Sequence, residues 1–192
     1  MYYPGQLKNK NFRKLWISDL FLGFAANIEV LIIPWIIITK TNSGLLLGIY
    51  GAARYFSTVF APVIGGVIDG FNKKHTLIIS RVYMFIHSLI IMILSFHDIL
   101  SVTNLIVISF FYGLAHNFDR ISREALTQII ISKQNLRNAT ALISSTYDVS
   151  KIVAPIIGAT IYSLYGVTVA FILVGILYLL AVFVIFAVKI NN

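Results

Sequence analysis

Six long apolar segments constrain this chain more than any other feature of its sequence. A helix that crosses a bilayer core of about 30 Å needs roughly 20 apolar residues. Segments of about that length or longer cover residues 15–39, 44–68, 76–96, 101–119, 138–163 and 167–188. Only 11% of all residues are charged, against about 25% in a typical soluble domain. We therefore predict an all-α membrane protein, residues 1–192, whose single domain holds six transmembrane helices.

Turn-forming and charged residues separate these segments. The breaks lie at residues 41–44, 69–74, 97–98, 120–137 and 165–166. The fourth break is the least defined, because residues 121–132 are also compatible with an amphipathic helix on the cytoplasmic surface. The first apolar run is longer than the roughly 7–15 residues of a signal peptide core, and it contains Asp19 and Glu29. We therefore predict that it is the first membrane span.

Lysine and arginine are distributed very unevenly between the two predicted faces of the membrane. Cytoplasmic segments of membrane proteins carry an excess of these residues. The six-span arrangement leaves only Lys40 on one face. The other face receives Lys8, Lys10, Arg13, Lys14, Lys73, Lys74, Arg81, Arg120, Arg123, Lys133, Arg137 and Lys189. This bias predicts a multi-pass protein of the cell membrane with both termini in the cytoplasm, and it explains the net charge of +8 without nucleic acid.

Several chemical functions are disfavoured by what the sequence lacks. There is no cysteine, so disulfides and thiolate metal sites are excluded. We find no H-E-x-x-H, G-x-S-x-G or Walker sequence, so an enzyme is not expected and nucleotide-driven pumping would need a separate subunit. We expect neither a cofactor nor a metal.

A short sequence recurs three spans apart. APVIGG at 61–66, in the second span, is similar to APIIGA at 154–159, in the fifth. Segments three spans apart cross the membrane in opposite directions. The similarity is what two inverted three-helix repeats predict, although proline and glycine are common in membrane helices generally.

Four ionisable residues fall near the middle of predicted spans. Glu29, Arg54, Asp148 and Lys151 lie about ten to thirteen residues from a span end, on three different spans. Each costs at least about 2.5–3.5 kcal/mol to insert, so such residues indicate function by default. We expect all four to face the bundle interior, with Glu29 and Arg54 paired across helices. Two interpretations stay open, a neutral structural cluster and a site for a proton or substrate.

Other polar residues extend this list of candidates. Asp19, a turn into the first span, is open to hydration, and with Asn27 it forms part of a polar stripe that predicts a cavity. His87 is expected to be a hydrogen-bonded core residue, whereas His116 and Asn117 stay undecided. On the fifth span, small residues every four positions predict close helix packing beside Pro155; they are Ser150, Ala154 and Gly158.

The loop after the second span resembles a motif of the major facilitator superfamily. The family pattern is G-x-L-A-D-R-x-G-R-R, and residues 65–74 read GGVIDGFNKK. Gly65, Asp69, Lys73 and Lys74 match in register, whereas Gly70 and Asn72 replace the arginine and the second glycine. The resemblance implies a gating loop, and we expect Asp69 to tie it to a basic group, with Arg123 as the candidate.

Matches to the macrolide-efflux and siderophore-exporter branch of that superfamily cover nearly the whole chain. They are NFRKLW at 11–16, AAR at 52–54, REA at 123–125 with Asn138-Ala139, Lys151, and APIIG at 154–158, which resembles the antiporter motif G-P-x-x-G-G. The resemblance implies the amino-terminal half of a twelve-helix transporter. Spans one and four would line the cavity, and spans two and five would meet a second six-helix half.

We therefore predict half, or a fragment, of a secondary transporter. It would export a small amphipathic compound in exchange for protons by alternating access in the lipid bilayer. The second half would be a missing segment, a partner chain or another copy of this chain. The alternative is a membrane protein that does not transport, either a partner protein or an inactive remnant.

Overall fold

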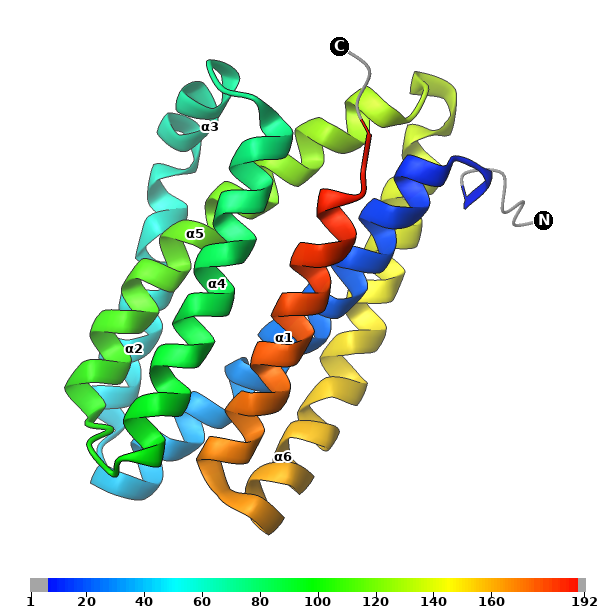
Figure 1. Cartoon of the computed structure of the whole chain (residues 1–192). Helices are drawn as coiled ribbons and strands as arrows, with labels where there is room; N and C mark the ends of the chain where they lie inside the picture. Colours follow the sequence, from blue (N-terminus) through cyan, green and yellow to red (C-terminus); the bar gives the residue numbers. More distant parts are fainter. Residues whose placement is uncertain (1–6, 190–192) are drawn as a thin grey trace.

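The computed structural model describes residues 7–189, and this part of the chain is a bundle of helices without strands (Figure 1). The helices are α1 (Lys10–Thr41), α2 (Gly44–Tyr55), α3 (Ala61–Asp69), α4 (Lys73–Phe96), α5 (Val102–Ile130) and α6 (Lys133–Phe186). A short 3-10 segment, η2 (Phe56–Phe60), joins α2 to α3.

Polar side chains define where several helices begin. The side chains of Asn9, Ser43, Asn72 and Ser101 each accept a hydrogen bond from a backbone N–H in the first turn of the helix that follows. Such caps satisfy N–H groups that have no partner within the helix. The predicted breaks at residues 41–44 and 69–74 thus correspond to capped helix starts.

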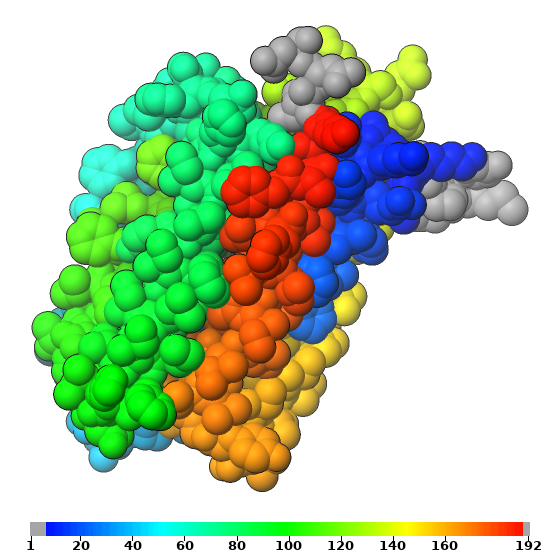
Figure 2. Space-filling view, viewed as in Figure 1, coloured from blue at the N-terminus to red at the C-terminus, as the bar shows by residue number. Residues whose placement is uncertain are grey.

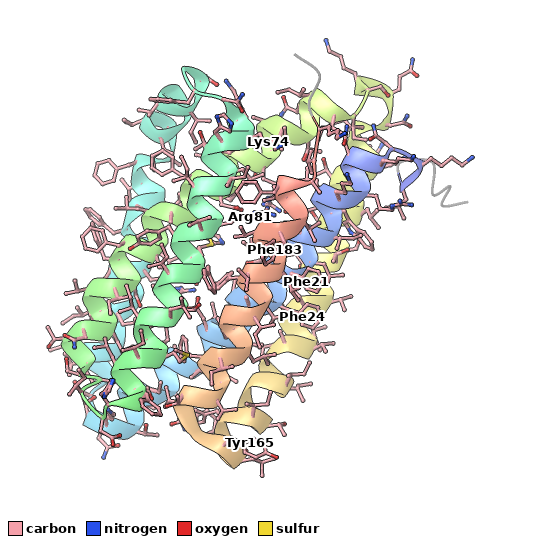
Figure 3. The ribbon with its side chains drawn as sticks, viewed as in Figure 1. Phe21, Phe24, Lys74, Arg81, Tyr165 and Phe183 are labelled. Carbon is pink, nitrogen blue, oxygen red and sulfur yellow. The ribbon has the colours of Figure 1, made fainter. Side chains whose placement is uncertain are left out.

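The helix α6 consists of two arms that reverse direction at Gly166. A continuous helix of its 54 residues would be about 81 Å long, far more than a bilayer core of about 30 Å. Gly166 has φ 81° and ψ −176°, a backbone conformation open mainly to glycine. The first arm (yellow) and the second arm (orange to red) run antiparallel in Figure 1, with Tyr165 labelled beside the reversal in Figure 3.

The chain reversals are divided between the two ends of the bundle. The start of α1, the end of α6, and the α3–α4 and α5–α6 connections lie at the upper end in Figure 1. The α1–α2 connection, the α4–α5 connection and the reversal at Gly166 lie at the lower end. We call the upper end the basic end, because the described segments there contain most of the lysines and arginines.

The helix α1 packs closely against the first arm of α6 through small residues. A Cβ atom added at Gly158 would lie 2.9 Å from Cγ2 of Ile28, and one added at Gly23 would lie 3.1 Å from Oγ of Ser150. Ser150, Ala154 and Gly158 are all buried. On the face shown in Figure 2, α4 (green) and the second arm of α6 (orange to red) lie side by side along their length.

Four helical segments of the described chain are long and apolar enough to cross a membrane. They are Lys10–Thr41, Gly44–Asp69, Lys73–Phe96 and Lys133–Phe186. The helix α5 is less apolar because Asn104, His116, Asn117 and Asp119 interrupt its hydrophobic residues. It also continues to Ile130, eleven residues past the predicted end of the fourth span, so the polar break expected at 120–137 is mostly helical.

Candidate functional site

Glu29 is the centre of a buried polar cluster in the middle of the bundle. Its side chain, on α1, is fully buried. The Tyr178 hydroxyl, on the second arm of α6, donates a hydrogen bond of 2.8 Å to Oε2 of Glu29, and the same hydroxyl lies 3.1 Å from that of Tyr112 on α5. A carboxylate is thus held at the meeting point of three helices.

Arg54 supplies the positive charge of this cluster. It lies on α2, is only 4% exposed, and its Nη2 atom is 3.8 Å from Oε2 of Glu29. The guanidinium carbon lies 4.1 Å from the centre of the Tyr112 ring, a distance at which a cation is attracted to an aromatic face. The expected pairing of Glu29 and Arg54 across helices is therefore present in the structure.

His87, on α4, brings a second titratable group to Glu29. Its Nδ1 atom lies 3.1 Å from Oε1 of Glu29, but the two atoms are not aligned as a hydrogen bond. The ring lies 4.8 Å from that of Tyr112, centre to centre. We name Glu29, Arg54, His87, Tyr112 and Tyr178 the central cluster. With His87 neutral its formal charge is zero, and one added proton makes it +1.

A second set of buried charges lies towards the basic end. Arg81, on α4, donates 2.8 and 2.5 Å hydrogen bonds to Oδ1 of Asp119, on α5, and Oδ1 of Asp19, on α1. It also donates to the Ser18 hydroxyl, which in turn donates to the Ala181 carbonyl oxygen on α6. We name Ser18, Asp19, Arg81 and Asp119 the inner cluster.

Three cavities separate α5 from the first arm of α6, and Tyr147 lines all of them. The largest, of about 380 Å³, also contacts Arg123, Ile143, Asp148 and Lys151. A second, of about 130 Å³, reaches Asp19 and Asp119 in the inner cluster. The smallest, of about 70 Å³, reaches Arg54 and Tyr112 in the central cluster. Both buried clusters therefore border space beside the same aromatic ring.

The expectation that all four midspan charges face the interior is wrong for Asp148 and Lys151. These two residues pair with each other at 3.1 Å, as their i, i+3 spacing allows. Their side chains are 68% and 54% exposed, however, and they line the largest of the three cavities beside Tyr147. The face of α6 that packs on α1 is occupied by the small residues instead, so the charges on this arm point into the open space.

The structure also corrects the expected partner of Asp69. Arg123 lies 3.9 Å from Oδ2 of Asp19 and makes no ion pair with Asp69 in the described part of the chain. Asp69 is exposed, and it is its backbone carbonyl that accepts a 2.8 Å hydrogen bond from Lys73. In the same loop region, Lys74 donates to the carbonyl of Phe186, which holds the end of α6 beside α4.

Most of the remaining polar candidates have local partners. Asp19 is buried and ion-paired, which differs from the hydrated position left open for it. The Asn27 amide donates to the Gly23 carbonyl and to Ser150 Oγ. Asn117 donates to Ser57 Oγ, and His116 lines two of the cavities. Two candidates without polar side chains are less closely packed. A Cβ atom added at Gly65 would have no heavy atom within 4 Å. Pro155 is half-buried.

Sequence reasoning misses the key residues of the inner cluster and two tyrosines. The charge bias places Arg81 at the cytoplasmic surface although it lies within the predicted third span, and Asp119 is the last residue of the predicted fourth span. A charge of each sign inside neighbouring spans is a signal that could have paired them. Nothing in the sequence distinguishes Tyr112 and Tyr178 from the other eight tyrosines.

An apolar helical bundle that buries charges in its interior is typical of membrane transport proteins. The chain belongs to the transmembrane secretion effector family of the major facilitator superfamily, which matches residues 4–192. It is also similar to macrolide efflux protein A of Streptococcus pyogenes and to its counterpart in the serotype M6 strain, with 21% identity over 155 residues in each case. That similarity covers 80% of this chain but only 38% of the relatives' length.

Proposed function

We propose that this chain is one half of a secondary transporter that exports a small amphipathic compound in exchange for protons. The observation that carries the proposal is the fully buried Glu29, held between Arg54, His87 and Tyr178 from three other helical segments. Intramembrane carboxylates with such partners mark proton and substrate pathways. The family and the efflux relatives support transport as the general activity.

The composition of the central cluster supports proton coupling. Burial favours the neutral form of a carboxyl group, whereas a neighbouring cation favours the charged form. Arg54 already balances Glu29, so a proton taken by Glu29 or His87 leaves one uncompensated positive charge. That charge is costly in an apolar interior unless the helices move or water enters. Protonation is thereby linked to a change of shape, which alternating access requires.

The cavities beside Tyr147 suit an amphipathic compound. Their walls combine the apolar side chains of Leu136 and Ile143 with the charged side chains of Arg123, Asp148 and Lys151. Trp16 lines the adjoining cavity, and its indole N–H donates to Thr146. Binding sites for small molecules combine apolar walls with a few placed polar groups in this way.

The proposed membrane arrangement has six spans, with α5 and both arms of α6 among them. The antiparallel course of the arms supports it (Figure 1), as does the length of α6, since its 54 residues divided at Gly166 leave each arm long enough to cross a bilayer core. The concentration of lysine and arginine at one end supports a cytoplasmic position for that end. The similarity of residues 61–66 to 154–159 supports two inverted three-helix repeats.

A transport assay tests the proposal. The chain would be produced in an efflux-deficient bacterium and purified in whatever assembly it forms, then reconstituted into liposomes with an imposed pH gradient. We expect uptake of a labelled macrolide or a fluorescent amphipathic cation that stops when a protonophore is added. Glu29→Gln should abolish the gradient-driven uptake while substrate binding, measured by equilibrium dialysis, persists.

A control is Asp98→Asn, which removes an exposed carboxylate from the α4–α5 connection, outside the three cavities beside Tyr147. Normal gradient-driven uptake by Glu29→Gln would assign the central cluster to structure alone. A well-folded assembly that moves none of these compounds, with or without a gradient, would favour the non-transporting alternative.

A further inference from the structure

A largely apolar groove lies on the outside of the bundle, away from both buried clusters. It has a volume of about 410 Å³ and is formed by α3, α4 and α5. Most of its lining residues are apolar or aromatic, and they include Val67, Phe71, Ile79, Phe111, Leu114 and Phe118. Phe71 and Ile79 are 64% and 68% exposed, so these side chains lack a protein partner on their outer side.

The groove exists because α3 packs on α5 but has little contact with α4. Where α2 meets α5 the contact is close, since a Cβ atom added at Gly113 would lie 2.0 Å from the Arg54 carbonyl oxygen. The chain then passes through the 3-10 segment η2 and into α3, which has Pro62 in its first turn. Only Ile64 and Ile68 of α3 are buried. Most of α3 is therefore not covered by its neighbours, and the groove opens between this helix and α4.

Basic residues lie at one end of the groove. The groove's wall on α4 begins at Thr76, directly after Lys73, Lys74 and His75, and it reaches Tyr83 about 10 Å further along the helix. Lys73 Nζ bonds to the Asp69 carbonyl on α3, so this ammonium group lies on the groove side of α4. An ammonium group has three N–H donors, so this bond leaves others for a ligand.

We propose that the groove binds one anionic phospholipid, with an acyl chain along the apolar wall and the phosphate at Lys73. In a membrane, an apolar groove on the outside of the bundle is filled by lipid unless protein covers it. Basic sites beside spans at the cytoplasmic side recognise anionic headgroups, and each lysine near the surface contributes attraction. The loop carries two lysines against the single carboxylate of Asp69, so its net charge favours an anion.

Native mass spectrometry of the detergent-solubilised protein tests this site. The delipidated chain would be incubated with equal amounts of dioleoyl phosphatidylglycerol and dioleoyl phosphatidylcholine. We expect one phosphatidylglycerol to be retained preferentially. Lys73→Gln should lower its retention roughly five-fold. Lys40→Gln is the matched control, because Lys40 also bonds to a backbone carbonyl, that of Leu100, but lies at the opposite end.

A second pair of variants tests the apolar wall. Leu114→Trp fills the groove and should reduce retention of the lipid, whereas Val107→Trp adds the same side chain to an exposed site of α5 outside it. Circular dichroism and gel filtration would check that each variant is folded. Equal retention of the two lipids by the unmodified chain, or by Leu114→Trp and Val107→Trp, would overturn the proposal. These results do not depend on transport.

Discussion

The Nε atom of Arg81 lies 2.8 Å from a carboxylate oxygen of Asp119, and both side chains are buried. The same guanidinium also bonds to Asp19, so one residue of α4 holds charged partners on α1 and α5. In Figure 3, Arg81 lies below Lys74 on α4, inside the bundle rather than at its end. The inner cluster therefore joins the helices close to the basic end.

We expect Arg81→Gln to destabilise the bundle strongly, because it removes the cation that pairs with buried Asp119 and leaves buried Asp19 with only Arg123, 3.9 Å away, among the described residues. Removing one partner of a buried ion pair costs about 3–5 kcal/mol. The measurement is the midpoint of thermal unfolding in detergent. Arg120→Gln is the control, because its pair with Glu124 is largely exposed and such pairs contribute up to about 1 kcal/mol. Equal shifts for the two variants would contradict the structure.

Gly113→Ala should also be destabilising. The added Cβ atom would lie 2.0 Å from the Arg54 carbonyl oxygen, so α2 and α5 would have to separate. Overpacking of this kind typically costs about 1–3 kcal/mol. The unfolding midpoint of the purified variant measures the effect. Gly51→Ala adds the same methyl group on α2 with no heavy atom within 4 Å, so a loss of stability there would show that the effect is not steric.

The contact between α1 and α6 predicts a compensating pair of substitutions. Gly158→Val should weaken the packing, since even a Cβ atom lies 2.9 Å from the Ile28 side chain. Ile28→Ala makes room, so the double variant should recover part of the stability lost in Gly158→Val. Residues in contact show such non-additive effects. If the change in the unfolding midpoint of the double variant equals the sum of the two single changes, Ile28 and Gly158 are not in contact.

Reporter fusions test the proposed orientation. A reporter fused after Lys74 or Arg137 should be located in the cytoplasm, because both positions lie at the basic end. Fusions after Asn42, Asp98 and Tyr165 should be active outside. A reporter found outside after Arg137 would mean that α5 does not cross the membrane, or that the two arms of α6 cross it in the opposite directions.

The helical segments are predictable because their causes are local. Runs of apolar residues, capping side chains such as Asn72 and the glycine at position 166 mark where helices begin, end or reverse. The extension of α5 to Ile130 is less predictable. The residues after Asp119 are polar enough to suggest a loop, but tertiary contacts such as that between Arg123 and Asp19 hold them in the helix.

The candidate site is predictable only in part, because rotation of a helix about its axis is set by packing. Glu29 and Arg54 stand out as charges in apolar spans, and the structure pairs them. The same reasoning places Asp148 and Lys151 inside, but Ser150 and Ala154 take the buried face of that arm. Arg81 resembles a surface residue in the sequence, because a position near a span end says nothing about which way the side chain points.

The reversal of α6 at a single residue has a mechanical consequence. A long loop would let the two arms tilt independently. Here Gly166 alone links them, so a movement of one arm is transmitted to the other. The first arm carries Tyr147 and the cavity wall, and the second carries Tyr178 and its bond to Glu29. A tilt of the first arm that widens the cavity would therefore also move the second arm, and with it the Tyr178 hydroxyl that is bonded to Glu29.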